Sequence, residues 1–167
     1  MRLYLIRHAH AVAEEENASR PLSPRGRQDV ARITAWLRTS RAFTPAQLWH
    51  SPLERARETA AILAHTLDQE IVRVETTGLL PEDSPLEIAE RLETFPAGEN
   101  LAIVGHEPHL SALATLLVRG KRKPAAFELK KGSVLALEPN GGVHKRTGRS
   151  RWHACWLLSP ELLPPAS

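Results

Sequence analysis

The sequence predicts one α/β domain, a three-layer α/β/α sandwich with a mainly parallel central sheet. Short apolar runs typical of buried strands alternate with longer segments whose apolar residues recur at helical spacing. This alternation favours parallel strands covered by helices on both faces. The 167 residues suit a single hydrophobic core. We expect the domain to span residues 1–160, with residues 161–167 as a frayed tail.

The first half of the chain contains three predicted strands and two predicted helices. The strands are expected at residues 2–6, 46–52 and 70–75, and the helices at residues 25–40 and 53–67. The first strand is the apolar run RLYLI, which is rich in β-favouring residues. Ser23 followed by Pro24 is typical of a helix start, because serine caps the free N–H groups and proline suits the first helical position.

The second half continues the pattern and then changes. A helix is expected at residues 85–95, a strand at 99–106 and a helix at 108–120, with Gly120 as its stop. Two strand-like runs follow, residues 130–138 and 151–159, around a loop at 139–150. We expect these two strands to pair with each other or with the edge of the sheet.

The composition indicates an ordinary globular protein. Hydrophobic residues make up 42% and charged residues 25%, and the net charge of +3 favours anionic partners. No secretory signal and no apolar stretch of about 20 residues is visible, so we expect a cytoplasmic protein. The single cysteine, Cys155, excludes a disulfide within the chain and is expected to be a small buried residue in a reducing compartment. Trp36 and Trp156 are expected in the core, and Trp49 and Trp152 closer to the surface.

Polar residues gather at the predicted strand ends. The first strand ends on Arg7 and His8, the second leads into a helix whose first turn carries Arg55, and the fourth ends on Gly105 and His106. In open α/β sheets, ligands bind outside the carboxyl ends of the strands. An isolated arginine or histidine at such a position is usually a surface or structural residue. Parallel strands would bring this whole set to one rim, which favours a functional site.

These residue types have the chemistry of a phosphate site. Guanidinium groups bind phosphate oxygens bidentately and keep their charge, and helix N-termini supply N–H donors. A neutral imidazole among them carries a lone pair that can attack phosphorus. Nearby arginines disfavour the protonated form, so the pKa of such a histidine is expected below its usual value of about 6.5.

The chain resembles the histidine phosphatase superfamily, whose fold is called phosphoglycerate mutase-like. LIRHAHA is similar to the family's Arg-His-Gly signature, with Ala9 in place of glycine; SPLERARETA is similar to the motif with its second arginine, and VGHEPHL to the motif with its second histidine. RPLSPRGR, ELKKGSV and WLLSPELL look like the small SixA-type phosphohistidine phosphatases. Together these segments span nearly the whole chain.

The resemblance implies a role for each matching position. His8 would be the nucleophile that accepts the phosphoryl group, while Arg7, Arg55 and His106 would hold its oxygens, and water would then hydrolyse phospho-His8. No metal or organic cofactor is expected. Larger relatives use a carboxylic acid to protonate the leaving alcohol, and here Glu82, beside Asp83, is the candidate general acid.

The expected activity is that of a phosphatase acting on phosphohistidine carried by another protein, such as a histidine-phosphotransfer domain. An imidazole leaves more easily than an alkoxide, so the absence of a strong acid motif favours this substrate. Little chain between Arg55 and His106 is left for a lid, which also favours an open pocket. Arg20 is a candidate substrate-binding residue at the rim. Hydrolysis of a small phosphomonoester is the alternative.

Two other functions have less support in the sequence. His8 with His10, and His106 with His109, are pairs that zinc can use, but no acidic or cysteine partner completes the set and two arginines would repel the ion. Basic stretches at residues 119–124 and 144–151 suggest nucleic-acid binding, but they lack interleaved aromatic residues. We therefore expect neither a metal-binding nor a nucleic-acid-binding protein.

Overall fold

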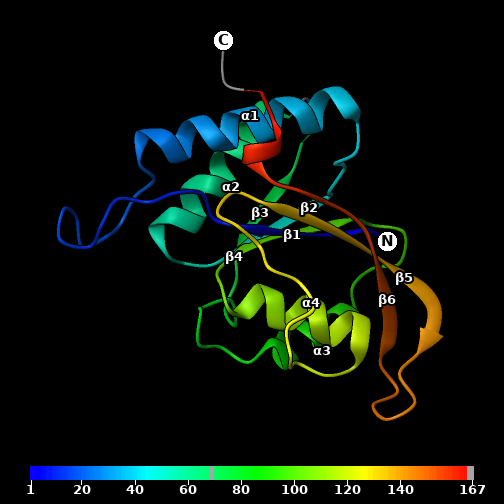
Figure 1. Ribbon diagram of the computed structural model, residues 1–167. Coiled ribbons are helices and arrows are strands. Elements are labelled where there is room, and N and C mark those ends of the chain that lie inside the picture. Colours follow the sequence, from blue (N-terminus) through cyan, green and yellow to red (C-terminus); the bar gives the residue numbers. More distant parts are fainter. Residues whose placement is uncertain (68–69, 165–167) are drawn as a thin grey trace.

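The computed structural model describes residues 1–67 and 70–164 and contains one six-stranded sheet (Figure 1). The strand order is β3-β2-β4-β1-β5-β6. The strands are β1 (Leu3–Arg7), β2 (Gln47–His50), β3 (Val72–Glu75), β4 (Leu101–Gly105), β5 (Val134–Val143) and β6 (Ser150–Leu158). The helices are α1 (Pro24–Ser40), α2 (Glu54–Thr66), α3 (Pro85–Glu93), α4 (His109–Arg119) and the short 3₁₀ helix η1 (Pro160–Leu162).

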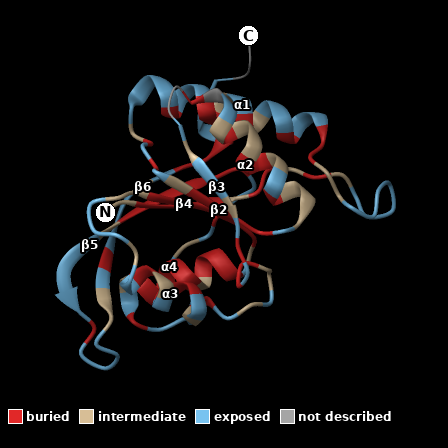
Figure 2. Ribbon diagram, turned by 180° about the vertical axis from the view of Figure 1, so that it is seen from behind, coloured by how far each residue is buried: buried red, intermediate tan, exposed pale blue. Residues whose placement is uncertain are grey.

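The sheet is covered on both faces, which confirms the three-layer α/β/α sandwich. Helices α1 and α2 lie on one face, and α3 and α4 on the other (Figures 1 and 2). Strands β1 to β4 are joined by parallel ladders, and β5 and β6 extend the sheet through antiparallel ladders. Figure 2 shows the central strands and the inner helix faces as buried, whereas much of β3, β6 and the second half of β5 is exposed. The fold is therefore the predicted mainly parallel α/β fold.

Each face of the sheet has its own apolar core, and the alternation of side chains along β1 separates them. Leu3 and Leu5 pack against α3 and α4, whereas Tyr4 and Ile6 pack against α1 and α2. Successive side chains of a strand point to opposite faces, so one buried strand supplies both cores. This explains why β1 is a continuous apolar run and not an alternating one.

The predicted helix boundaries follow from local chemistry. The side chain of Ser23 accepts a hydrogen bond from the Gly26 N–H at 3.1 Å, and Pro24 occupies the first turn of α1. At the end of α4, Gly120 has a left-handed φ of 70° and its N–H donates to the Leu116 carbonyl. Both signals are visible in the sequence, and both positions are confirmed.

The β5–β6 pair differs from the prediction in length. The residues Pro139–Val143 were expected in a loop, but β5 continues to Val143. The ladder is irregular, with register shifts after Ala136 and after Pro139. Proline and glycine are disfavoured in strands, which is why a loop was expected here. Main-chain pairing of Pro139 and Val143 with β6 nevertheless extends β5 at this exposed end.

Four predictions of burial were wrong. Cys155 is exposed on the edge strand β6. Trp36 is 39% exposed, whereas Trp49 and Trp152 are 7% and 3% exposed and belong to the core. Trp49 lies on a central strand, where the sheet order and not the residue type decides burial.

The C-terminal part is fixed to α1 as far as it is described. The guanidinium of Arg32 donates to the carbonyls of Leu163 and Pro164 at 3.2 and 2.9 Å. Of the predicted tail, residues 165–167 lie outside the described residues, and the domain limit at residue 160 stays a prediction. Within residues 1–67 and 70–164, no helix combines the length and apolar character needed to cross a membrane.

Candidate active site

The carboxyl ends of β1, β2 and β4 lie next to each other, as the sequence predicted. Arg7 pairs in register with Gly105, and His50 pairs with Val104. The N–H of His8 donates to the Gly105 carbonyl at 3.0 Å, and the N–H of Ser51 donates to the Val104 carbonyl at 3.1 Å. The residues that follow the three strands are therefore held side by side by main-chain hydrogen bonds.

The ring of His8 has a defined tautomer. Its Nδ1 lies 2.7 Å from the Ala9 carbonyl oxygen, which can only accept, so Nδ1 carries the proton. The lone pair is then on Nε2, and the Nε–H of Arg55 donates to this nitrogen at 3.3 Å. The geometry thus presents the nucleophilic nitrogen of His8 to a guanidinium group.

Burial and positive charge keep His8 neutral. His8 is 7% exposed, and its burial lowers its pKa to about 3. The hydrogen bond to Ala9 opposes this shift, while His106, Arg55 and Arg7 each disfavour a further positive charge. The direction agrees with the prediction from sequence, but burial is the largest cause and not the arginines.

His106 lies against His8, with 4.9 Å between the two ring centroids. It is 1% exposed, and its Nε2 lies 2.8 Å from the Ser51 hydroxyl oxygen. Burial, and then the positive charge of Arg55, lower its pKa to about 4. Ser51 was not recognised from the sequence, although its place at the end of β2 was a signal that it faces the same rim.

The two arginines of the predicted set are held differently. Arg55 is in the first turn of α2, and burial and the nearby Arg20 lower its pKa. Arg7 donates from Nη1 to the Leu129 carbonyl at 2.8 Å, and its buried Nε has no hydrogen-bond partner among the described residues. A buried guanidinium N–H without a partner is the kind of donor that an anionic ligand satisfies.

Ala9 replaces a glycine without strain. Arg20 and Arg41 are the non-glycine residues with positive φ among those described, so Ala9 does not need a glycine conformation. Its N–H donates to the Thr59 hydroxyl at 3.2 Å, and that hydroxyl donates to the Arg55 carbonyl at 2.7 Å. Thr59 therefore ties the residue after His8 to the helix that carries Arg55, a role that sequence reasoning missed.

Arg20 and Lys131 add positive charge to this rim. Arg20 adopts a φ of 50° and lies near enough to lower the pKa of Arg55. Burial lowers the pKa of Lys131, as do Arg7, Arg20, Arg25 and Arg55, so Lys131 lies in their common field. Lys131 was not recognised from the sequence as part of this rim, because nothing in the KK pair shows which surface it joins.

Two carboxylic acids, Glu82 and Glu107, differ in environment. Glu82 is exposed in the turn before α3. Glu107 follows His106 directly, and burial raises its pKa while Arg7 opposes the shift. Glu107 also lines a pocket of about 810 Å³ together with Pro108, Ser111, Arg122, Lys123 and Phe127. Glu107 was not recognised from the sequence, although its position next to His106 was a signal.

The fold and the site define a class of protein. A neutral imidazole with a free lone pair lies beside a guanidinium and a second imidazole at the carboxyl edge of an α/β sheet. This is the arrangement that binds a phosphoryl group and can accept it on nitrogen.

Comparison with known proteins gives the family. Residues 3–82 match the model of the histidine phosphatase superfamily, branch 1. The uncharacterized protein Rv1276c of Mycobacterium tuberculosis is 35% identical over 127 residues, which cover 67% of this chain and 69% of that protein. The chain belongs to the histidine phosphatase superfamily and is an enzyme of that group.

Solved structures share the fold over nearly the whole chain. The protein histidine phosphatase SixA, complexed with tungstate, has a TM-score of 0.81 at 19% identity, covering 97% of this chain and 99% of that one. The alpha-ribazole phosphatase from Shigella flexneri has a TM-score of 0.63 at 20% identity, covering 92% and 95%. The fold is therefore the phosphoglycerate mutase-like fold of SixA.

Proposed function

We propose that this enzyme hydrolyses phosphohistidine carried by another protein, through a phosphorylated His8. The observation that carries the proposal is the geometry of His8, whose Nδ1–H is held by the Ala9 carbonyl while Nε2 faces Arg55. A fixed lone pair and a low pKa make this nitrogen a nucleophile that stays unprotonated at neutral pH.

The reaction has two steps. Nε2 of His8 attacks phosphorus, the bond from phosphorus to the substrate imidazole breaks, and the bonding electrons return to that imidazole nitrogen, which takes a proton. Water then attacks the phosphorus of phospho-His8, releases inorganic phosphate and returns the ring to its neutral form. Arg7, Arg55 and His106 stabilise the charge on the phosphoryl oxygens in both steps, since fixed donors lose no energy in reorganisation.

A protein substrate is supported by what surrounds the site. Between α2 and β4 the chain forms only β3, a turn and α3, so no inserted domain lies over the carboxyl edge in the described residues. The rim cations Arg20 and Lys131 suit an acidic partner, and Arg20 is proposed to contact the substrate. The cytoplasmic location expected from the sequence stays a prediction.

The choice of substrate is tested by direct competition. A phosphorylated histidine-phosphotransfer domain and a small phosphomonoester, such as p-nitrophenyl phosphate, are compared by kcat/KM. We expect the phosphorylated domain to be the better substrate, because its leaving imidazole needs no strong acid. Faster turnover of the monoester would favour the alternative function, hydrolysis of a small phosphomonoester.

The intermediate is tested by labelling. A radioactive phosphodonor is expected to give a label on the enzyme that is stable in base and labile in acid, as a phosphorus–nitrogen bond is. His8→Ala is expected to lose both the label and turnover, whereas His65→Ala, a change at an exposed residue of α2, keeps both. A label of normal stoichiometry on His8→Ala would refute the proposed nucleophile.

A general acid matters only for an alcohol leaving group. Glu82 is the acid that the sequence suggests, and Glu107 is a second candidate because burial raises its pKa. We expect Glu107→Gln to lower kcat for a phosphomonoester by about 10²-fold and to leave phosphohistidine hydrolysis little changed. Glu82→Gln is the matched variant. If only this variant loses kcat for the phosphomonoester, Glu82 and not Glu107 is the general acid.

A further inference from the structure

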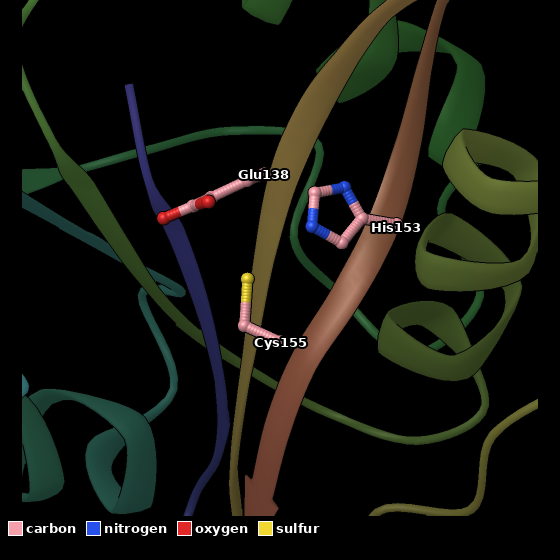
Figure 3. A group of neighbouring side chains, drawn as sticks. All are labelled: Glu138, His153 and Cys155. Carbon is pink, nitrogen blue, oxygen red and sulfur yellow. The ribbon is translucent and has the colours of Figure 1, made fainter.

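A second group of reactive side chains lies on β5 and β6, away from the active site. The side chains of Glu138 of β5 and of His153 and Cys155 of β6 lie close together (Figure 3). One donor atom of each, a carboxylate oxygen, an imidazole nitrogen and the sulfur, lies within 4.8 Å of the other two. Neither the phosphatase chemistry nor the family motifs use these residues.

We propose that Glu138, His153 and Cys155 form a zinc-binding site. Thiolate, imidazole and carboxylate are the three ligand types that zinc takes in proteins. Zinc–ligand bonds of about 2.0–2.3 Å in a tetrahedron separate the ligand atoms by about 3.3–3.8 Å. Side-chain rotations that move the ligand atoms by about 1 Å would bring them from within 4.8 Å of one another into that range. A water molecule would fill the fourth position.

The strand pairing explains how the three residues converge. Glu138 and His153 are direct cross-strand partners, which brings their side chains to the same face of the sheet. Ala136 pairs with Trp156 and Leu137 with Ala154, so Cys155 is the extra residue of a β-bulge. A bulge re-aims a side chain, and here it turns the sulfur toward the Glu138–His153 pair.

The local charges are compatible with a cation. The Nε–H of Arg2 donates to Oε1 of Glu138 at 2.6 Å, which lowers the pKa of that carboxyl and keeps it ionised. The other carboxylate oxygen can bind an ion. Zinc binds the thiolate, so binding displaces the thiol proton of Cys155, which passes to solvent. Arg2 weakens the site by repulsion but leaves the ligands in place.

The site is separate from the phosphate site. Arg2 precedes β1 and Arg7 ends it, so the two sites lie at opposite ends of a five-residue strand, about 17 Å apart. A zinc ion bound there joins the edge strand β6 to β5 across the irregular part of their ladder. It would stabilise the sheet edge and would take no part in the phosphoryl transfer at His8.

Cobalt(II) in place of zinc gives a direct spectroscopic test on the full, reduced chain. Cys155 is the single cysteine, so any thiolate-to-cobalt charge-transfer band must come from it. We expect one cobalt per chain with that band, and its displacement by zinc. Cys155→Ser abolishes the band, while His153→Ala and Glu138→Gln raise the zinc Kd at least tenfold.

The controls separate a built site from adventitious binding. His65→Ala removes an exposed histidine elsewhere and is expected to leave the zinc Kd unchanged. Far-ultraviolet circular dichroism of the metal-free variants confirms that each folds. Zinc is expected to raise the melting temperature of the wild type but not of Cys155→Ser. A zinc Kd that is unchanged in His153→Ala, one ion shared by two chains, or no binding at micromolar zinc would each overturn the proposal.

Discussion

The nitrogen of His8 that faces Arg55 has no proton, and this state depends on burial more than on charge. From the sequence, the residues of the site and their common rim could be predicted, because parallel strands place their carboxyl ends together. The sequence could not reveal which ring nitrogen is free, since that depends on a hydrogen bond to the Ala9 carbonyl. Nor could it reveal Thr59, which acts through the main chain of Ala9.

The low pKa values of His8 and His106 predict how stability depends on pH. In the unfolded chain each histidine takes up a proton near pH 6.5, whereas in the folded chain they do so only near pH 3 and 4. Between these values the unfolded state binds more protons, so stability falls as the pH falls through 6.5. At pH 5 each buried histidine costs about 2 kcal/mol relative to pH 8.

Urea unfolding at pH 8 and pH 5 measures this cost. His8→Gln removes one titrating group, so the loss of stability between the two pH values is expected to shrink by about 2 kcal/mol. His65→Gln changes an exposed residue and serves as the matched control. An equal loss in the wild type and in His8→Gln would show that His8 titrates normally in the folded protein.

The guanidinium of Arg55 is expected to contribute directly to catalysis. Its Nε–H contacts Nε2 of His8, and its charge is proposed to stabilise the phosphoryl oxygens. Arg55→Ala is expected to lower kcat by 10² to 10³, roughly the effect of removing one preorganised donor. Arg57→Ala is the control, because Arg57 lies two residues further along α2 and pairs with Glu54 at the surface. This variant should keep kcat.

At the scale of elements, the start of α1 is fitted closely to the strand that carries the nucleophile. A Cβ on Gly26 would lie 2.0 Å from the His10 carbonyl oxygen, so the helix and the chain after β1 are in backbone contact. Ser23, the cap of α1, also bonds through its hydroxyl to Nδ1 of His10 at 2.8 Å. The sequence predicted the cap, but not the close approach, which depends on the packing of α1 over the sheet.

Gly26→Ala is therefore expected to be destabilising. The clash is with main-chain atoms that cannot rotate away, so we expect a loss of about 3 kcal/mol and a melting temperature lower by roughly 6–12 °C. Gly141→Ala is the comparison, because Gly141 has a φ of 78° but nothing within 4 Å of an added Cβ. It should cost only about 1 kcal/mol of backbone strain, and equal losses would refute the contact.

At the scale of the whole molecule, the charge of the chain is modest but unevenly placed. The net charge is only +3, yet Lys131 lies in the combined field of Arg7, Arg20, Arg25 and Arg55. Composition alone indicated a preference for anions, and folding decides where that preference acts. The burial of Trp49 and Trp152 was not predictable in the same way, because it depends on which face of the folded sheet each side chain meets.

This concentration of charge predicts a salt effect on catalysis. Attraction between the rim and an anionic partner acts over a Debye length of about 10 Å at 0.1 M salt and over less at higher salt. For a phosphorylated acidic protein, kcat/KM is expected to fall several-fold between about 0.02 and 0.5 M salt while kcat stays nearly constant. Lys131→Ala should flatten this dependence and Lys121→Ala, at an exposed position after α4, should not.

The main chain around His8 is anchored from two sides. Its N–H donates to the carbonyl of Gly105 at the end of β4, and its carbonyl accepts from the N–H of Gly132 before β5. The reactive ring is therefore attached to the centre of the sheet, while most of the rim around it is formed by loops. Exchanging those loops between relatives should change which phosphorylated molecule is admitted while leaving the chemical step intact, and this is a practical route to retargeting the enzyme.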